Sequence, residues 1–240
     1  MKNSKLILIV FFASATLLFA SYMLARPWIS LRKIDTLQVK GYAELQVKSD
    51  SSAMTVTIKN VAKTLADAYD LCSTQMNEVK ALASSILGKH EISDLNTEVD
   101  EICKLDDKGN KTNFVDNYAV KRAIRIESSN VESMKKLAAS INDLNGKGVM
   151  ALIEGPSFFV NNLEATKVNL VRQATENGKA RAQEMAKSAG YSLGRLVSAR
   201  QGVIQITKMN SSDTSDWGVY DTQTIEKVAK LAVSLEFEIE

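Results

Sequence analysis

Two hydrophobic periodicities alternate along residues 36–240. Residues 36–48 alternate strictly between apolar and polar side chains, which predicts a strand with one buried face. A polar turn at 50–52 separates this strand from a second one, around residues 54–58, and the two are expected to form a hairpin. Apolar residues then recur every third or fourth position, which predicts a helix of about seven turns between a cap at Asn60 and a stop at Gly88. The apolar positions of this helix are Val61, Leu65, Tyr69, Cys72, Met76, Val79, Ala83 and Ile86.

The next segment repeats this arrangement with a shorter helix. Alternating residues predict a second pair of strands at about 94–104 and 114–127. Ser129 and Glu132 have the spacing of a capping box, so we expect a helix to begin there. A further strand is predicted at about 148–154, before Gly155-Pro156.

A long helix and two strands complete the chain. Asn161 and Glu164 are expected to start the helix, and Gly190 to end it. Its predicted buried seam is rich in small residues, and consists of Val168, Val171, Thr175, Gly178, Ala182, Met185 and Ala189. Strands are predicted at 195–207 and 231–239.

The predicted order is ββα-ββ-α-β-α-ββ, with seven strands, two long helices and one shorter helix. Runs of strands mixed with helices in this way indicate an α+β fold with antiparallel or mixed sheets. No flexible linker interrupts residues 34–240, so we interpret them as one compact unit that follows an N-terminal segment, residues 1–33.

That N-terminal segment contains an uncharged apolar run, residues 6–25, after Lys2 and Lys5. Twenty helical residues span about 30 Å, the thickness of a membrane hydrocarbon core. We therefore predict a retained transmembrane signal anchor in a bacterial inner membrane, with the body in the periplasm. Cleavage is the alternative, and would give a periplasmic or secreted protein, but Met23-Leu24-Ala25 is a poor cleavage site.

The distribution of charge excludes nucleic acid as a partner. The chain has 30 basic and 28 acidic residues, and five of the basic ones lie in residues 1–33, which have no acidic residue. The remainder is therefore slightly acidic and has no basic cluster of the kind that nucleic-acid binding requires.

Candidate catalytic chemistry is sparse. The single histidine, His90, follows a helix end, where a solvated structural role is expected. Cys72 and Cys103 lack the spacing of a zinc site, and the segment 145–148 is a turn between a helix and a strand rather than a phosphate-binding loop. We expect no catalytic residue, no cofactor, no metal and therefore no enzymatic activity.

The two cysteines leave a choice between a disulfide and free thiols. An oxidising compartment favours a bridge. Cys72 lies on a helix and Cys103 on a strand, and side-chain packing between such elements usually holds Cα atoms farther apart than the 4.4–6.8 Å or so that a disulfide needs. We predict two buried free thiols.

Several segments together resemble the SIMPL-domain (DUF541) family, in its membrane-anchored bacterial subgroup. They are Val39-Lys40-Gly41, Asp94-Leu95-Asn96-Thr97, Tyr118-Ala119-Val120, the run from Ala174 to Gly194, and the tail from Ser198 to Lys227. One departure is Tyr42-Ala43, where many members have a second glycine. The resemblance implies an α+β fold, a cell-envelope location, homo-oligomers in some members and a link to oxidative-stress tolerance. It carries no catalytic residue and no cofactor.

Two functions remain as alternatives. The first is a non-enzymatic, membrane-anchored envelope protein that self-assembles and supports stress tolerance. The second is an envelope binding module for a lipid, peptide or hydrophobic small molecule, which requires a large apolar pocket between the small-residue helix and the sheet.

The polar segment 209–226 is the predicted interface. It contains Trp217, Val219 and Tyr220, and aromatic residues are common anchors of contact surfaces. The alternative is a loop that folds back on its own sheet.

Overall fold

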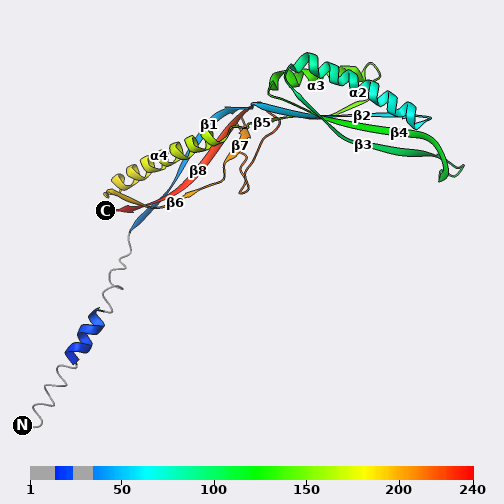
Figure 1. The fold of residues 1–240 in the computed structure, drawn as a ribbon. Coiled ribbons are helices and arrows are strands. Elements are labelled where there is room, and N and C mark those ends of the chain that lie inside the picture. Colours follow the sequence, from blue (N-terminus) through cyan, green and yellow to red (C-terminus); the bar gives the residue numbers. More distant parts are fainter. Residues whose placement is uncertain (1–13, 24–34) are drawn as a thin grey trace, which may run out of the picture.

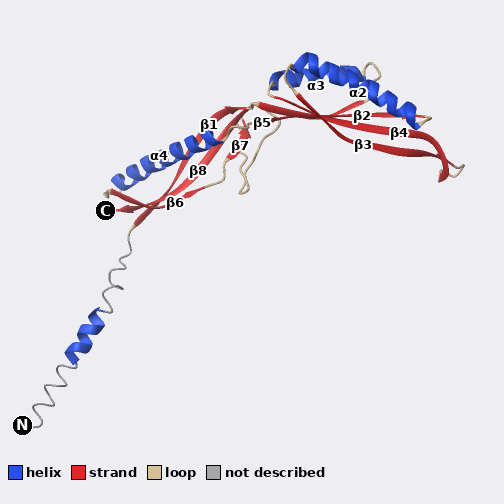
Figure 2. Cartoon of the chain, in the orientation of Figure 1, coloured by secondary structure: helices blue, strands red, loops and turns tan. Residues whose placement is uncertain are grey.

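The computed structural model describes residues 14–23 and 35–240 (Figure 1). Residues 14–23 are helical. The body contains two four-stranded antiparallel sheets that lie end to end in an elongated, arched molecule, with helices on one face of each sheet (Figure 2).

The first sheet, which we call the terminal sheet, contains both ends of the body. Its strands and its helix are β1 (Thr36–Lys48), β8 (Glu226–Ile239), β6 (Leu193–Gln201), β7 (Gln205–Lys208) and α4 (Glu164–Ser188). The central strand β8 pairs with β1 over its whole length, from Thr36 opposite Glu238 to Lys48 opposite Glu226.

The second sheet, which we call the distal sheet, has the strand order β3-β4-β2-β5. Its elements are β2 (Ser51–Ala62), α2 (Leu65–Leu87), β3 (Glu91–Leu105), β4 (Lys111–Ser128), α3 (Val131–Asn145) and β5 (Ala151–Phe159). Helix α2 packs mainly on β2 and β4, and α3 packs on α2 and β5.

Each sheet has its own hydrophobic core. Met54, Val56 and Ile58 of β2 pack against α2 and α3, whereas the terminal sheet packs against Leu170 and Ala174 of α4. A small third cluster, Val131, Phe158 and Ile225, lies where the sheets meet. The unit expected over residues 34–240 therefore contains two lobes, each of which consists of one sheet and the helices packed on it.

The predicted hairpin between the first two strands is wrong. β1 pairs with β8, and β2 pairs with β4 and β5. The short link between them crosses from one sheet to the other. On the terminal side, the backbone N–H of Ser49 donates to the O of Ile225, just before β8, at 2.9 Å. On the distal side, the N–H of Asp50 donates to the O of Phe159, at the end of β5, at 2.9 Å.

Helix α2 begins later than predicted. Asn60 is not its cap, since β2 continues to Ala62, and the Asn60 amide instead donates to Gln75 Oε1 at 2.8 Å. Thr64 is the cap, and its hydroxyl accepts a hydrogen bond from the N–H of Asp67 at 3.1 Å. Val61 of the predicted stripe is therefore in the strand, while the stripe from Cys72 to Ala83 is buried as expected.

The starts of the other two helices also differ from the prediction. Asn130, rather than Ser129, caps α3, by accepting from the N–H of Ser133 at 3.1 Å. Helix α4 starts at Glu164, with Leu163 rather than Asn161 at the N-cap position and no side-chain cap. The N–H of Asn161 instead donates to the carboxylate of Asp50 at 2.9 Å, at the junction of the sheets.

The body has eight strands rather than seven. The predicted strand 195–207 is divided into β6 and β7 near Gly202, and β8 starts at Glu226 rather than near residue 231. The order is therefore ββα-ββ-α-β-α-βββ, and the α+β class with antiparallel pairing is confirmed.

The buried face of α4 agrees with the predicted seam at Gly178 and Ala182 but differs from it elsewhere. Val168 and Met185 are 69% and 50% exposed. The buried residues are Leu170, Ala174, Gly178, Ala182 and Ala186. The face is set by Gly41 of β1, which sits directly against the backbone of Ala174 and Gly178 and so leaves no room for larger side chains.

Most of the predicted transmembrane run, residues 6–25, lies outside the described residues. Within residues 14–23 and 35–240, no helix is both long and apolar enough to cross a membrane. The predicted transmembrane helix is therefore not confirmed.

Candidate functional site at the junction of the two sheets

The segment between β7 and β8 is ordered by one side chain, that of Gln205. Its amide N–H donates to Ser215 O at 2.8 Å, and its carbonyl oxygen accepts from the N–H of Val219 at 2.7 Å. Backbone bonds join Ile206 to Val219 and to Asp221. The backbone of the segment thus folds back on its own sheet, as the alternative interpretation expected.

The three predicted interface residues are not brought together. Trp217 is 95% exposed. Tyr220 turns toward the end of β5, where its hydroxyl accepts from the N–H of Val160 at 2.8 Å and its ring lies 6.5 Å from that of Phe159. Val219 is half-buried, and its backbone carries the bonds to β7. Trp217 is thus the most exposed of the three, although Tyr220 also keeps 41% of its surface exposed.

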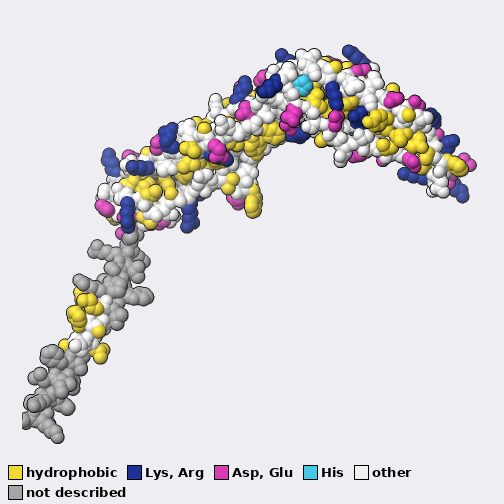
Figure 3. Space-filling view, in the orientation of Figure 1, with side chains coloured by type: hydrophobic (Ala, Val, Ile, Leu, Met, Phe, Trp, Pro, Cys, Tyr) yellow, Lys and Arg dark blue, Asp and Glu magenta, His cyan; other side chains and the backbone are white. Residues whose placement is uncertain are grey.

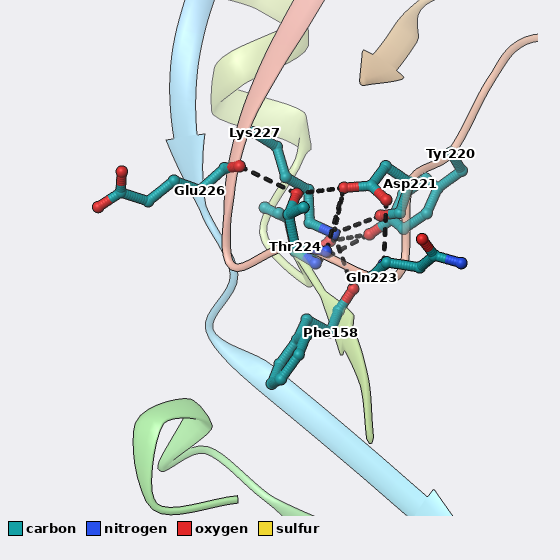
Figure 4. A network of polar contacts seen from close by, with 8 residues as sticks. Phe158, Tyr220, Asp221, Gln223, Thr224, Glu226 and Lys227 are labelled. Carbon is teal, nitrogen blue, oxygen red and sulfur yellow. Dashed lines mark hydrogen bonds and ion pairs between the residues drawn. The ribbon is translucent and has the colours of Figure 1, made fainter. Parts of the chain in front are cut away.

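Beside Tyr220, the side chain of Lys227 is completely buried. It lies within a network of polar contacts (Figure 4). Its Nζ donates to Phe158 O at 3.1 Å and to Asp221 O, and lies 3.6 Å from the Asp221 carboxylate. The Tyr220 ring centroid is 5.9 Å away. One cation therefore connects β8, the end of β5 and the 209–225 segment.

The Asp221 carboxylate is held by several donors. The N–H groups of Gln223 and Thr224 donate to it at 3.0 and 3.2 Å, and so does the Thr224 hydroxyl. Burial acts to raise the pKa of Asp221, but these hydrogen bonds and the charge of Lys227 outweigh it, so the pKa is lowered. For Lys227, burial lowers the pKa despite the opposing effect of Asp221.

This network joins the lobes rather than presenting a reactive group. A lysine acts as a nucleophile through an accessible neutral amine, whereas the Lys227 amine has no exposed surface and is bonded to two backbone carbonyls. The sequence contained one signal for it. Lys227 is in phase with Leu231, Val233 and Leu235 on the buried face of β8, but the strand was predicted to start too late to include it.

The other candidate residues lie apart from the junction. His90 Nδ1 is 2.7 Å from Gly88 O, at the end of α2. Both cysteines are free, as predicted, but only Cys72 is buried, whereas Cys103 is half-buried. Across residues 14–23 and 35–240, no group of three His, Cys, Asp or Glu side chains could hold a metal ion.

The interface between α4 and the terminal sheet leaves no space for an apolar ligand at its centre. A Cβ added to Gly41 would lie 2.0 Å from the carbonyl oxygen of Ala174 and 2.7 Å from the backbone nitrogen of Gly178. The small residues of α4 therefore serve close packing, and the apolar pocket required by the binding-module hypothesis is not found there.

Solved structures with some similarity are remote. An amidase of the hydantoinase/carbamoylase family from Burkholderia vietnamiensis is 13% identical with a TM-score of 0.31, over 63% of this chain and 34% of that one. A second such amidase, from Burkholderia multivorans, is 10% identical with a TM-score of 0.30, over 65% and 34% of the two chains. The de novo designed protein Foldit4 is 16% identical with a TM-score of 0.23, over 42% and 93%. This chain thus spans about a third of the length of the amidases.

Comparison with curated proteins gives no match. A family model does match, over residues 37–238, and its description is SIMPL, protein of unknown function (DUF541). The match covers all eight strands and the three helices of the body. The chain therefore belongs to the SIMPL (DUF541) family.

Proposed function

We propose that this protein is a non-enzymatic, membrane-tethered component of the bacterial cell envelope that assembles into a homo-oligomer. The observation that carries the proposal is the exposure of Trp217 on an ordered loop. Its neighbours are fixed by Gln205, yet the indole is 95% exposed, and large aromatic side chains in this position are typical anchors of protein contacts.

A second apolar surface lies on the other lobe, in the distal part of the β3–β4 hairpin. Phe114 and Leu105 are 74% and 63% exposed, and Val99 and Ile102 are also exposed. Figure 3 shows hydrophobic side chains at this end of the molecule and on the loop beneath the junction. Strand β3 also forms an edge of the distal sheet.

Two different apolar surfaces on separate lobes favour a head-to-tail contact between copies. In such a contact, the Trp217 loop of one copy packs on the β3–β4 hairpin of the next. Repetition of this contact closes into a ring or extends into a filament, depending on the rotation between neighbours.

Native mass spectrometry of the full chain in detergent tests this arrangement. Trp217→Ala and Phe114→Ala should each reduce the oligomer to monomer, because removing a central aromatic anchor costs about 2 kcal/mol or more per contact. Tyr191→Ala is the matched control, since Tyr191 is 51% exposed but follows α4, away from both surfaces. The Tyr191→Ala chain should form an oligomer of the same stoichiometry as the wild type.

Mixing the two variants gives a sharper result. A Trp217→Ala chain keeps its hairpin and a Phe114→Ala chain keeps its loop, so one intact contact can form between them. The mixture should therefore contain heterodimers and no larger species. If both variants keep the wild-type stoichiometry, or if the mixture contains monomers alone, the head-to-tail contact is wrong.

The proposed tether is the apolar run of residues 6–25. In its described part, residues 14–23, the side chains of Leu17, Leu18 and Phe19 are 74%, 71% and 63% exposed. Such exposure suits a lipid environment better than water. The wild-type chain should stay with membranes after a carbonate wash, and Leu17→Lys with Leu18→Lys should release it. A double variant that remains in the membrane would contradict the tether.

A periplasmic body also makes the protein accessible from outside the inner membrane. Protease added to intact spheroplasts should therefore degrade residues 34–240. Protection of the body until the membrane is dissolved would place it in the cytoplasm instead.

A role in oxidative-stress tolerance extends the proposal, on the basis of the family resemblance. Deleting the gene should lower bacterial survival in hydrogen peroxide, and the wild-type chain should restore survival. The Trp217→Ala chain should restore less of it if tolerance depends on assembly. Equal restoration by both chains would contradict that dependence.

A further inference from the structure

The terminal sheet has an uncovered polar face. Helix α4 packs on one side of β1 and β8, so the alternate residues of these strands point to the other side, where no helix lies among residues 35–240. The face carries small side chains along β8, Ala232 and Ser234, between longer ones on β1 and β6. A row of small residues flanked by large ones forms the floor of a groove.

The groove consists of two adjoining hollows of about 390 and 880 Å³, and both are lined by Lys40 and Ser234. The smaller extends along β1, β8 and β6. The larger continues to the segment 212–216, which forms one wall. Most other side chains that line the groove are polar, and they include Ser198, Ser212, Thr214, Ser215, Gln38 and Gln205.

Two cations flank the middle of the floor. Ser234 pairs with Lys40 of β1 on one side and with Arg200 of β6 on the other, so the three residues form one row across the sheet. Because adjacent strands are about 4.8 Å apart, the backbones of Lys40 and Arg200 are separated by about 10 Å. Their two charged groups can therefore converge on one anion above the Ser234 hydroxyl.

Within residues 14–23 and 35–240, the side chains of Lys40, Arg200 and Ser234 have no hydrogen-bond or ion-pair partner. Two other cations on this face of the sheet do have partners. Arg195 pairs with Glu238, and Lys230 donates to Ser211 O. Of the three cations that line the groove, Lys40, Arg200 and Lys230, the first two therefore remain available to a ligand.

The acidic groups of the groove lie outside this row. Glu236 is on the neighbouring row, where it accepts hydrogen bonds from Thr36 at 2.8 Å and from Gln38 at 3.4 Å. Asp216 lies at the opposite end, in the wall formed by the loop. An anion between Lys40 and Arg200 therefore faces two cations in its own row, with Glu236 in the adjacent row and Asp216 at the far end of the groove.

We propose that this groove binds an acidic glycan, with a carboxylate of the sugar chain between Lys40 and Arg200. A guanidinium group matches the two oxygens of a carboxylate, and the lysine adds a second charge. The serine, threonine and glutamine side chains along the groove can exchange hydrogen bonds with sugar hydroxyls. The proposal is independent of self-assembly, because it uses the open sheet face rather than Trp217 or the β3–β4 hairpin.

Calorimetric titration of the full chain tests this site, in a detergent without a sugar headgroup. The probes are tetragalacturonate, neutral maltotetraose and inorganic phosphate. Tetragalacturonate should bind, and maltotetraose should bind at least about tenfold more weakly because it lacks the charge-assisted bonds. Raising the salt concentration should weaken the binding of tetragalacturonate.

Three variants locate the site. Arg200→Ala and Lys40→Ala should each reduce the affinity for tetragalacturonate about tenfold or more. Ser234→Tyr should block the floor of the groove without removing a charge. These positions are exposed and their side chains have no partner in the described part of the chain, so the variants should fold. Lys187→Ala is the matched control, because Lys187 is exposed on α4, on the covered side of the sheet.

Several outcomes would overturn the proposal. They are undetectable binding of tetragalacturonate at millimolar concentration, equal binding of maltotetraose, and an equal loss of affinity in Lys187→Ala. Inorganic phosphate that binds as tightly as tetragalacturonate would show recognition of a bare anion and would also overturn it. Native mass spectra of the same samples show whether any loss of binding accompanies a loss of assembly.

Discussion

Gly41 of β1 and Gly178 of α4 are in backbone contact: a Cβ added to Gly178 would lie 3.1 Å from the Cα of Gly41 and 2.6 Å from Leu235 Cδ1. This contact brings α4 onto the terminal sheet. It also positions two side chains of α4 at the edge of β1, where Asn177 Oδ1 accepts from the N–H of Tyr42 at 3.1 Å and Arg181 donates to Lys40 O at 3.3 Å. The small residues of α4 thus allow the helix both to pack on β1 and to cover part of its edge.

Gly41→Ala should destabilise the protein by about 3 kcal/mol or more, because the new methyl group meets backbone atoms that cannot move separately. The free energy of unfolding in urea measures the loss. Gly146→Ala is the control, since Gly146 has helical backbone angles and the nearest atom to an added Cβ is 3.3 Å away. A loss in Gly41→Ala no larger than in the control would show that the helix can shift.

The local elements could be predicted because each depends on periodicity within a short segment. Alternation located β1 and β4, and spacing of three and four located α2, including the buried Cys72 and Met76. Pairing between distant strands could not be predicted in the same way. Thr36 lies opposite Glu238, and nothing near β1 in the sequence distinguishes this partner from the adjacent β2.

The junction was missed for a related reason. Its residues come from β5, the 209–225 segment and the start of β8, and they become neighbours only when the two sheets meet. A lysine in phase with the buried residues of a strand was the one available signal. The exposure of Trp217 likewise depends on how Gln205 fixes the loop, a contact that the polar composition of the segment does not reveal.

Lys227→Met should destabilise the protein by about 2–4 kcal/mol. The substitution fills similar volume but leaves Phe158 O and Asp221 O without their donor and removes the positive charge beside a nearly buried carboxylate. Urea unfolding measures the change. In the control, Lys121→Met, an exposed ion pair with Glu98 is lost, which should cost less than about 1 kcal/mol. Equal effects would mean that the buried network adds no more stability than a surface pair.

Stability should decrease in acid through Asp221. Its folded pKa is below the 3.8 of a free carboxyl group, so the unfolded chain binds a proton first as the pH falls. The stabilisation that the Asp221 carboxylate gives the folded state is therefore complete above about pH 5 and is lost as the pH falls through 3.8 toward the folded pKa. Lys227 affects stability on the alkaline side instead. Because its pKa in the folded protein is below 10.5, the free energy of unfolding rises with pH between that folded pKa and 10.5.

Asp221→Asn should consequently be less stable than the wild type at pH 7, and the difference should shrink as the pH falls below 5. Urea unfolding between pH 3 and pH 7 measures it. Asp143→Asn, at an exposed position of α3, controls for the loss of a carboxylate as such. A difference between Asp221→Asn and the wild type that stays constant over this range would contradict the role of Asp221 in acid sensitivity.

The two thiols should differ in reactivity. Cys72 is completely buried and its Sγ lies 3.2 Å from Val120 O, whereas Cys103 is half-buried near the end of β3. A thiol reagent should therefore label Cys103 in the native protein, and should reach Cys72 at least about a hundredfold more slowly, because that reaction requires local opening of α2. Cys103→Ser should remove the fast phase alone.

After denaturation without reductant, mass spectrometry should find two labels per chain. Absence of labelling in that sample would show a disulfide, and equal native rates would show that α2 does not protect Cys72.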